Sequence, residues 1–450
     1  MNNLDQFVEY ATDQLMQTVE IERELFDEYG VKRGLRNKDG SGVLVGLTKI
    51  SSVVGYKKEG GRIVPADGEL YYRGISIQDL VKGILKEERH GFPEVIYLLL
   101  FGRLPNEKEL ESFKDYMKPL ISLPPGLNET TILQFPSPSV MNKLQRVILV
   151  LYAFDDHPDD LSITNVVRQC LSLIAKFPLI IAYSYQSMRH GLYGDSLFVH
   201  PPHPDLCCAE NFLHMLRSDS KYSELESDLL DLTLMLHADH GGGNNSTFTT
   251  RVVTSSHTDT YSAIAAAVGS LKGPLHGAAN RSVIDMVNNI KDNVKDWNDE
   301  DEISVYLQKI LAKKAHDRTG LIYGMGHAVY TKSDPRAVVL KQKAKELASE
   351  KGRSDEYQLY LNIEKLTPGI FQKIKGSNKV ISPNVDFYSG FVYDLLNFPP
   401  EIYTPLFAMA RVVGWSAHRI EELINGKRII RPAYGALLST QPYLPLDDRK

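Results

Sequence analysis

The sequence predicts a mainly α-helical protein with one small β patch near its N-terminus. Apolar residues recur every three or four positions over most of the 450 residues, which is the spacing of one helix face. β-Branched residues and turn glycines gather only between residues 43 and 73. Strands do not alternate with helices along the chain, as they would around a parallel sheet, so we expect a helical fold.

The composition is that of a soluble globular protein. Hydrophobic residues make up 43% and charged residues 24%, and a formal net charge of -5 gives no sign of a nucleic-acid partner. The N-terminal residues are polar and acidic, unlike a signal or transit peptide, and we expect no apolar run long enough to span a membrane. Three cysteines without metal-ligand spacing favour a reducing compartment. We therefore expect a cytoplasmic protein.

The elements follow in order along the chain. A first helix is expected over residues 5–29, and the β patch after it is expected to turn at Asp67-Gly68. Three prolines around His200 and His203 predict a loop, with both histidines at the surface. Apolar stripes predict the other helices, of which 141–154 and 163–188 are the most apolar and are expected to be central.

A histidine between two glycines lies in the turn Gly273-Pro274-Leu275-His276-Gly277. An amphipathic run follows, so we expect His276 at or near a helix N-terminus, where the helix dipole disfavours a positive charge. A neutral imidazole can donate one hydrogen bond to a carbonyl oxygen, which suits the formation of an enol from a thioester. Taken alone, such a residue is more often a simple turn histidine that caps a helix.

A second cluster is His237-Ala-Asp-His240 followed by three glycines, which let the backbone approach a ligand closely. The two histidines have the spacing of a metal pair, but no third ligand is evident, so we expect no metal. Termination of the preceding helix by glycine explains part of the pattern.

A third cluster, Gly324-Met325-Gly326-His327, places another histidine on a glycine turn, and Arg336 follows at the start of a helix. It lacks the third glycine and the preceding strand of a dinucleotide-binding motif, so we exclude NAD. An arginine at the start of a helix can bind a carboxylate through two hydrogen bonds.

The fourth cluster contains Asp386 among apolar and aromatic residues. Partial burial raises the pKa of a carboxyl group and makes it a better base, although Asp386 could equally cap the next helix. Arg411 lies inside a strongly apolar helix, where it requires an anionic partner. Arg431 precedes Pro432 in the C-terminal segment.

Taken together, the clusters resemble the motifs of the citrate synthase family, in order and in spacing. The four motifs are HADHGGGN from His237, GPLHGAAN from Gly273, GMGHAVY from Gly324 with DPR after it, and NVDFYSG from Asn384. The segments Tyr72–Ile75 and Leu98–Pro105 match as well, so the similarity runs from about Val43 to Gly435.

The resemblance implies a fold, an assembly and a reaction. A large helical domain would comprise residues 1–279 and 396–450, and a small helical domain, residues 280–395, would close over the cleft. The protein would be a homodimer with shared active sites. It would condense acetyl-CoA with oxaloacetate and hydrolyse citryl-CoA to citrate and CoA, at the start of the tricarboxylic acid cycle, with no cofactor beyond its substrates.

The resemblance also assigns roles by position. Asp386 would take a proton from the methyl group of acetyl-CoA, His276 would hydrogen-bond the thioester oxygen, and His327 would polarise the ketone of oxaloacetate. The oxaloacetate carboxylates would be held by four further residues: His240, Arg336, Arg411 and, from the other subunit, Arg431.

Three residues depart from the family pattern. Gly241 stands where many members have Glu, Thr331 where some have an arginine that contacts CoA, and Met325 where the residue is often aromatic. These departures concern CoA binding rather than the reaction.

Other functions stay open at this point. A 2-methylcitrate synthase would use propionyl-CoA with the same catalytic groups, because one methylene in a pocket changes binding by only about 1–3 kcal/mol. A non-catalytic scaffold of the same fold would have no reason to keep His276, His327 and Asp386 together. A metal hydrolase built on His237 and His240 lacks ligands.

Overall fold

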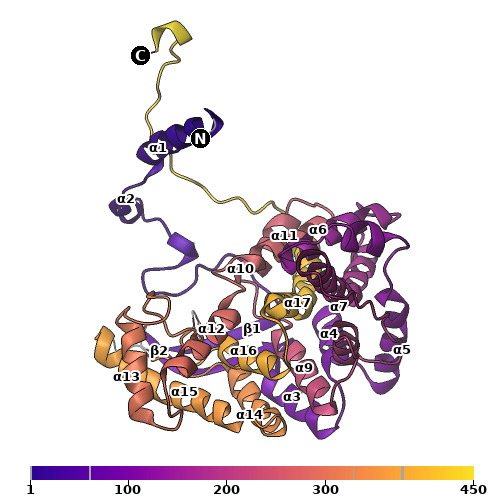
Figure 1. Ribbon diagram of the computed structural model, residues 1–450. Helices are drawn as coiled ribbons and strands as arrows, with labels where there is room; N and C mark the ends of the chain where they lie inside the picture. The colour runs from indigo at the N-terminus through magenta and orange to yellow at the C-terminus, as the bar shows by residue number, and fades with distance from the viewer. Residues whose placement is uncertain (1–2, 60–61, 328, 377–379, 450) are drawn as a thin grey trace. The chain divides into compact units, whose positions relative to one another are not determined.

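The computed structural model describes residues 3–59, 62–327, 329–376 and 380–449 (Figure 1). The chain forms two compact units, one made of Thr48–Ile429 and one made of the two ends, Met1–Leu47 and Ile430–Lys450. Helices take up 60% of the protein and strands 5%, as the sequence predicted. The predicted division at residues 280 and 395 falls within the first unit and stays a prediction.

The terminal unit contains the helices α1 (Asn3–Val19) and α2 (Arg23–Glu28). The single helix expected over residues 5–29 is therefore wrong, because the chain leaves the helix between Val19 and Arg23. Glu20 and Glu22 follow the end of α1, where the helix dipole disfavours negative charge. Among the described residues, the C-terminal segment has no helix or strand before a short 3-10 turn at Leu446–Asp448.

The small β patch is an antiparallel sheet in the order β1 (Ser51–Glu59), β2 (Arg62–Tyr72), β3 (Ile75–Ser76). The turn expected at Asp67-Gly68 is wrong, because β2 continues through both residues. Gly68 packs there against another segment: its N–H donates to Ser333 Oγ, and a Cβ would lie 2.1 Å from Ser333 O. Gly55 approaches Val329 O in the same way, so the sheet supports the segment after His327.

Helices make up most of the larger unit (Figure 1). Their bounds are α3 Ile77–Lys86, α4 Phe92–Phe101, α5 Glu107–Met117, α6 Val140–Leu151, α7 Ile163–Tyr193, α8 Cys208–Leu216, α9 Glu224–His237, α10 Asn245–Thr254, α11 Thr260–Lys272, α12 Ala279–Asn293, α13 Glu300–Leu311, α14 Pro335–Glu350, α15 Ser354–Lys375, α16 Val385–Leu395 and α17 Tyr403–Asn425.

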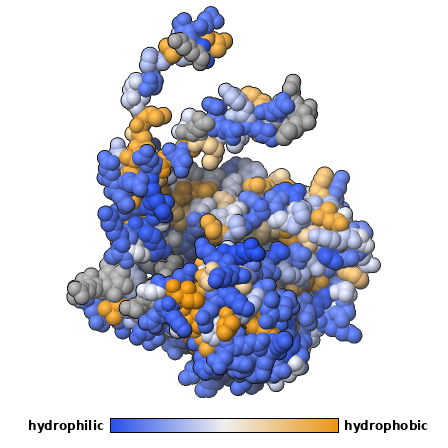
Figure 2. Space-filling view, turned by 60° about the vertical axis from the view of Figure 1, so that its left-hand side comes forward, coloured by the Kyte–Doolittle hydropathy of each residue, from blue (hydrophilic) through white to orange (hydrophobic). Residues whose placement is uncertain are grey.

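The core gathers around α7 and α17, which pack on each other. By length and composition α7 could cross a membrane, contrary to our expectation of no such run, but 83% of its most apolar window is buried inside the protein. The core position predicted for this segment is confirmed by its fully buried apolar side chains, such as Phe177 and Ile180. The face shown in Figure 2 is mostly hydrophilic, with separate apolar patches.

Helix α17 comes unusually close to the turn that follows α9. Gly414 makes this possible: its N–H donates to Ala238 O at 3.1 Å, and a Cβ on it would lie 2.3 Å from Asp239 Oδ1. The close approach places the middle of α17 directly beside the predicted His240 segment.

Candidate active site

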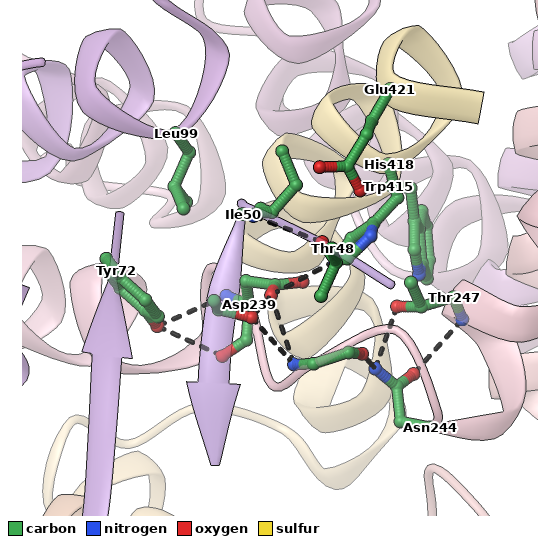
Figure 3. Close-up of polar contacts among 12 residues, drawn as sticks. Thr48, Ile50, Tyr72, Leu99, Asp239, Asn244, Thr247, Trp415, His418 and Glu421 are labelled. Atoms are coloured by element: carbon green, nitrogen blue, oxygen red, sulfur yellow. Dashed lines mark hydrogen bonds and ion pairs between the residues drawn. The ribbon is translucent and has the colours of Figure 1, made fainter. Parts of the chain in front are cut away.

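His240 lies in the short turn between α9 and α10. Gly241 takes a left-handed backbone with φ +78°, and Asn244 caps α10 by accepting a hydrogen bond from Thr247 N–H (Figure 3). The His240 ring lies 5.3 Å from the His327 ring, and its Nε2 is 3.2 Å from Tyr330 Oη. Burial lowers the pKa of His240 well below its usual value, with nearby Arg336 adding to the effect, so the ring is neutral at pH 7.

His276 lies in the turn between α11 and α12, three residues before the first turn of α12. Its Nε2 accepts a hydrogen bond from Ser246 N–H at 3.2 Å and lies 2.9 Å from Ser246 Oγ. The proton of the neutral ring is therefore on Nδ1. Burial lowers the pKa of His276 to about 4, and Arg411 contributes, so the predicted neutrality has this cause rather than the helix dipole.

His327 has its proton fixed in the opposite way. Its Nδ1 accepts hydrogen bonds from the N–H groups of Val329 and Tyr330, both at 3.0 Å, so the proton of the neutral ring is on Nε2. The turn itself is held by Gly326 N–H, which donates to Ser382 O at 2.7 Å. This contact joins the His327 turn to the segment that leads into α16.

Asp386 occupies the first turn of α16. The helix is capped by Asn384, whose side chain accepts a hydrogen bond from Asp386 N–H, so Asp386 itself is not the cap. Burial raises the pKa of Asp386 to about 6, while Arg336 and Arg411 act in the opposite direction. Asp386 thus has the properties of a general base near neutral pH.

The two buried arginines differ in their partners. Arg336 is 2% exposed and pairs through Nε and Nη2 with Asp334, which also accepts a hydrogen bond from Val385 N–H. Arg411 is 1% exposed; its Nε donates to His237 O at 2.7 Å, and its Nη2 has no hydrogen-bond partner among the described residues. A buried guanidinium group of this kind requires an anionic ligand.

Six of the seven predicted site residues thus belong to the larger unit and influence one another electrostatically. Arg431 is exposed and belongs to the terminal unit, so its predicted role stays a prediction.

Sequence reasoning missed Ser246, the residue that fixes the proton of His276. Its Oγ also accepts a hydrogen bond from Trp415 Nε1 at 3.1 Å. The available signal was its place just after the Asn244 cap, but its contact with His276 spans 30 positions in the chain.

One group of potential metal ligands occurs among the described residues, away from the predicted pair. Donor atoms of His90, Cys207 and Glu210 lie within 4.8 Å of one another. Cys207 and Glu210 are already brought together by the reciprocal cap of α8, in which each accepts the other's backbone N–H. His237 and His240 do not form a group of three potential ligands with any other described residue.

Comparisons with known proteins place the chain in a family. The family model for the citrate synthase C-terminal domain matches residues 38–433. The chain belongs to the citrate synthase family. It is therefore an enzyme of the acyltransferase type, and the predicted family, enzyme class and fold are confirmed.

Relatives of two names are about equally similar to this member of the family. Citrate synthase 2 of Bacillus subtilis is 34% identical over 414 residues, which cover 91% of this chain and 98% of the relative. The 2-methylcitrate synthase 1 of Corynebacterium glutamicum is 32% identical over 428 residues, which cover 93% and 98%.

The fold is shared with solved citrate synthases. The enzyme of Thermoplasma acidophilum, solved as a ternary complex with carboxymethyl coenzyme A and oxaloacetate, has a TM-score of 0.75 and 28% identity, covering 93% of this chain and 99% of that one. The Pyrobaculum aerophilum enzyme has a TM-score of 0.73 and 32% identity, with 90% and 94% covered.

Proposed function

We propose that this protein is a citrate synthase that condenses acetyl-CoA with oxaloacetate and releases citrate and CoA. The proposal is supported by two histidines with their protons fixed on opposite ring nitrogens and by a buried carboxyl group of raised pKa; Arg411 influences both that carboxyl group and His276. A Claisen-type condensation needs two oxygen-directed donors and one base, because it activates two carbonyl groups and removes one proton.

The first step is formation of the enol. The Asp386 carboxylate takes a proton from the methyl carbon of acetyl-CoA, while His276 Nδ1–H donates a hydrogen bond to the thioester oxygen, on which negative charge develops. A methyl group beside a thioester is a very weak acid, so base and donor have to act together. The low pKa of His276 keeps the ring a neutral donor, matched to a weakly acidic enol rather than to a full oxyanion.

The second step forms the carbon–carbon bond. The enol carbon attacks the ketone carbon of oxaloacetate, and the enol O–H proton returns to His276 as the thioester carbonyl forms again. The ketone oxygen becomes a hydroxyl group by taking the proton of His327 Nε2–H, and the proton that Asp386 removed from the methyl group balances this loss overall. Water then cleaves the thioester of citryl-CoA, which yields citrate and free CoA. Closure of the site over the substrates would keep water from hydrolysing acetyl-CoA earlier.

The carboxylates of oxaloacetate would be bound by His240, Arg336 and Arg411. Of the two arginines, Arg411 is the better placed to bind a carboxylate of the substrate, because its Nη2 has no partner among the described residues, whereas Arg336 already forms an ion pair with Asp334. Burial lowers the pKa of Arg411 to about 10, and the neighbouring guanidinium group of Arg336 adds to the effect. A dianionic ligand would satisfy the buried Arg411 Nη2 and relieve this repulsion.

We infer further that two copies form a dimer in which each supplies Arg431 to the site of the other. Support comes from the C-terminal segment, where Tyr434 is 95% and Leu438 90% exposed in the single chain. A second copy would cover such apolar side chains. We also propose that the enzyme works in the cytoplasm and needs no cofactor beyond its substrates.

The alternative is a 2-methylcitrate synthase. The similar identity to relatives of both names supports keeping it open, because the same catalytic groups serve acetyl-CoA and propionyl-CoA. A non-catalytic scaffold is disfavoured by the retention of both fixed histidines and the base.

The deciding experiment is a thiol-release assay with oxaloacetate that compares acetyl-CoA and propionyl-CoA. We expect kcat/KM to be at least about tenfold higher for acetyl-CoA than for propionyl-CoA, because one additional methylene in a pocket changes kcat/KM by about this factor. Equal or reversed values would identify a 2-methylcitrate synthase with the same mechanism. No release with either thioester would refute the proposed function.

A further inference from the structure

A fully buried carboxylate, Asp239, precedes His240 and lies at the centre of a polar network (Figure 3). Its Oδ2 accepts hydrogen bonds from Ser51 Oγ and from Gly241 N–H, the latter at 3.1 Å, and lies 3.3 Å from His418 Nε2. Its backbone N–H donates to Tyr72 Oη at 3.2 Å, and Tyr72 Oη donates to its carbonyl oxygen at 3.1 Å. These hydrogen bonds therefore fix the positions of the residues on both sides of His240.

His418 on α17 continues the network and is also fully buried. Its Nδ1 accepts hydrogen bonds from Arg251 Nε at 3.2 Å and from Arg251 Nη2 at 2.6 Å. Arg251 has only N–H donors, so Nδ1 cannot carry a proton and the ring proton lies on Nε2, which faces Asp239. The His418 ring thus accepts hydrogen bonds at Nδ1 and has a donor at Nε2.

Arg251 is in turn held by two carboxylates of α17. It pairs with Glu422 through Nη1 at 2.9 Å and with Glu421 through Nη2. Glu421 also accepts a hydrogen bond from Lys49 N–H, just before β1. The charge of Arg251 is therefore matched locally, and its hydrogen bonds to His418 fix the orientation of that ring.

The turn around His240 depends on side-chain contacts to stay in one conformation. Three successive glycines follow His240, and Gly241 has φ +78°, so this backbone has high conformational freedom. Gly241 N–H donates to Ser51 Oγ at 3.0 Å as well as to Asp239 Oδ2, and Asn244 Nδ2 donates to Gly241 O at 2.7 Å, so Asp239 restricts this backbone together with Ser51 and Asn244.

Helix α17 links this network to the anion-binding groups. Arg411 and His418 are seven residues apart, two turns of one helix, and Gly414 between them lets the helix touch the turn. The same helix thus contains Arg411, one of the residues proposed to bind the substrate carboxylates, and supports the turn that contains another of them, His240.

We propose that His418 is a positioning residue: through Asp239 it fixes the backbone at Gly241, and so sets where His240 meets the dicarboxylate substrate. The proposal rests on the proposed function for its substrate. Its central claim, that His418 orders the His240 turn, concerns the ligand-free protein as well.

Two amide variants of His418 test the claim as a matched pair. Glutamine places its amide nitrogen near the position of Nε2 and can still donate to Asp239, whereas asparagine reaches only the position of Nδ1. We expect His418→Asn to raise the KM for oxaloacetate about tenfold, about the effect of losing a hydrogen bond to a charged group. His418→Gln should stay within about twofold of the wild type. The KM for the acyl-CoA should be unchanged in both.

Amide hydrogen exchange of the 237–244 segment gives a readout that needs no substrate. The Gly241 N–H should exchange faster in His418→Asn and at the wild-type rate in His418→Gln. A merely structural role would affect both variants and both substrates alike, and that result, or no change in either variant, would overturn the proposal. If the wild type fails to consume oxaloacetate, the proposed function fails, and the exchange experiment still decides the positioning claim.

Discussion

The His276 turn and the His327 turn carry the same residue on similar glycine-rich motifs, yet the protein fixes their protons on opposite nitrogens. His276 accepts at Nε2 from Ser246 N–H, and His327 accepts at Nδ1 from two backbone N–H groups of its own loop. The tautomer of His276 is fixed by a segment distant in the chain, whereas the tautomer of His327 is fixed by neighbouring residues. Which nitrogen donates is therefore a property of the packing rather than of the motif.

Burial also determines the properties of Asp386, the base proposed for the same site. Burial lowers the pKa of His276 to about 4 and raises the pKa of Asp386 to about 6. The same physical cause thus keeps the histidine a neutral donor and makes the carboxylate a useful base.

The largest expected effect on turnover comes from removing the functional side chain of His276 or of Asp386. His276→Ala and Asp386→Ala should each lower kcat by about 10³-fold or more, because each removes a group that acts in the enol-forming step. Thiol release measures the loss. His203→Ala, at a residue whose side chain is 58% exposed in the loop before α8, is the control and should behave as the wild type.

Circular dichroism and the size of the protein in solution should be unchanged in both alanine variants. Turnover within tenfold of the wild type in either variant would remove that residue from the mechanism.

A smaller effect is expected from pH, and it separates Asp386 from His276. The base must be ionised, so kcat/KM should fall about tenfold per pH unit as the pH drops below about 6, the pKa of Asp386. Because His276 takes up a proton only near pH 4, a single ionisation should govern the range between them. A pH–rate profile measures this, and a midpoint near 4 or a loss of two protons would contradict the assignment.

Most of the fold could be predicted from the sequence, because helical apolar periodicity is a local signal. One of the two errors is at a place where a distant contact decides. Asp67 and Gly68 have the composition of a turn, but Gly68 remains in a strand because Ser333 packs against it. The break between α1 and α2 was missed because no proline or glycine marks it.

The site could be predicted in its residue types but not in its proton positions. His240, His276, His327 and Asp386, which the motifs contain, all belong to the larger unit. The tautomer of His276 depends on Ser246, and the order of the His240 turn depends on His418 of α17, far along the chain. Such relations arise only when the helices pack, and no periodicity records them.

The most direct test of the opposite tautomers is a crossed pair of amide substitutions at the two histidines. Asparagine mimics a donor at Nδ1 and glutamine a donor at Nε2. The account predicts that His276→Asn keeps about fivefold more kcat than His276→Gln, and that His327→Gln keeps about fivefold more than His327→Asn, the value of one hydrogen bond. The same preference at both positions, or a reversed one, would contradict the account.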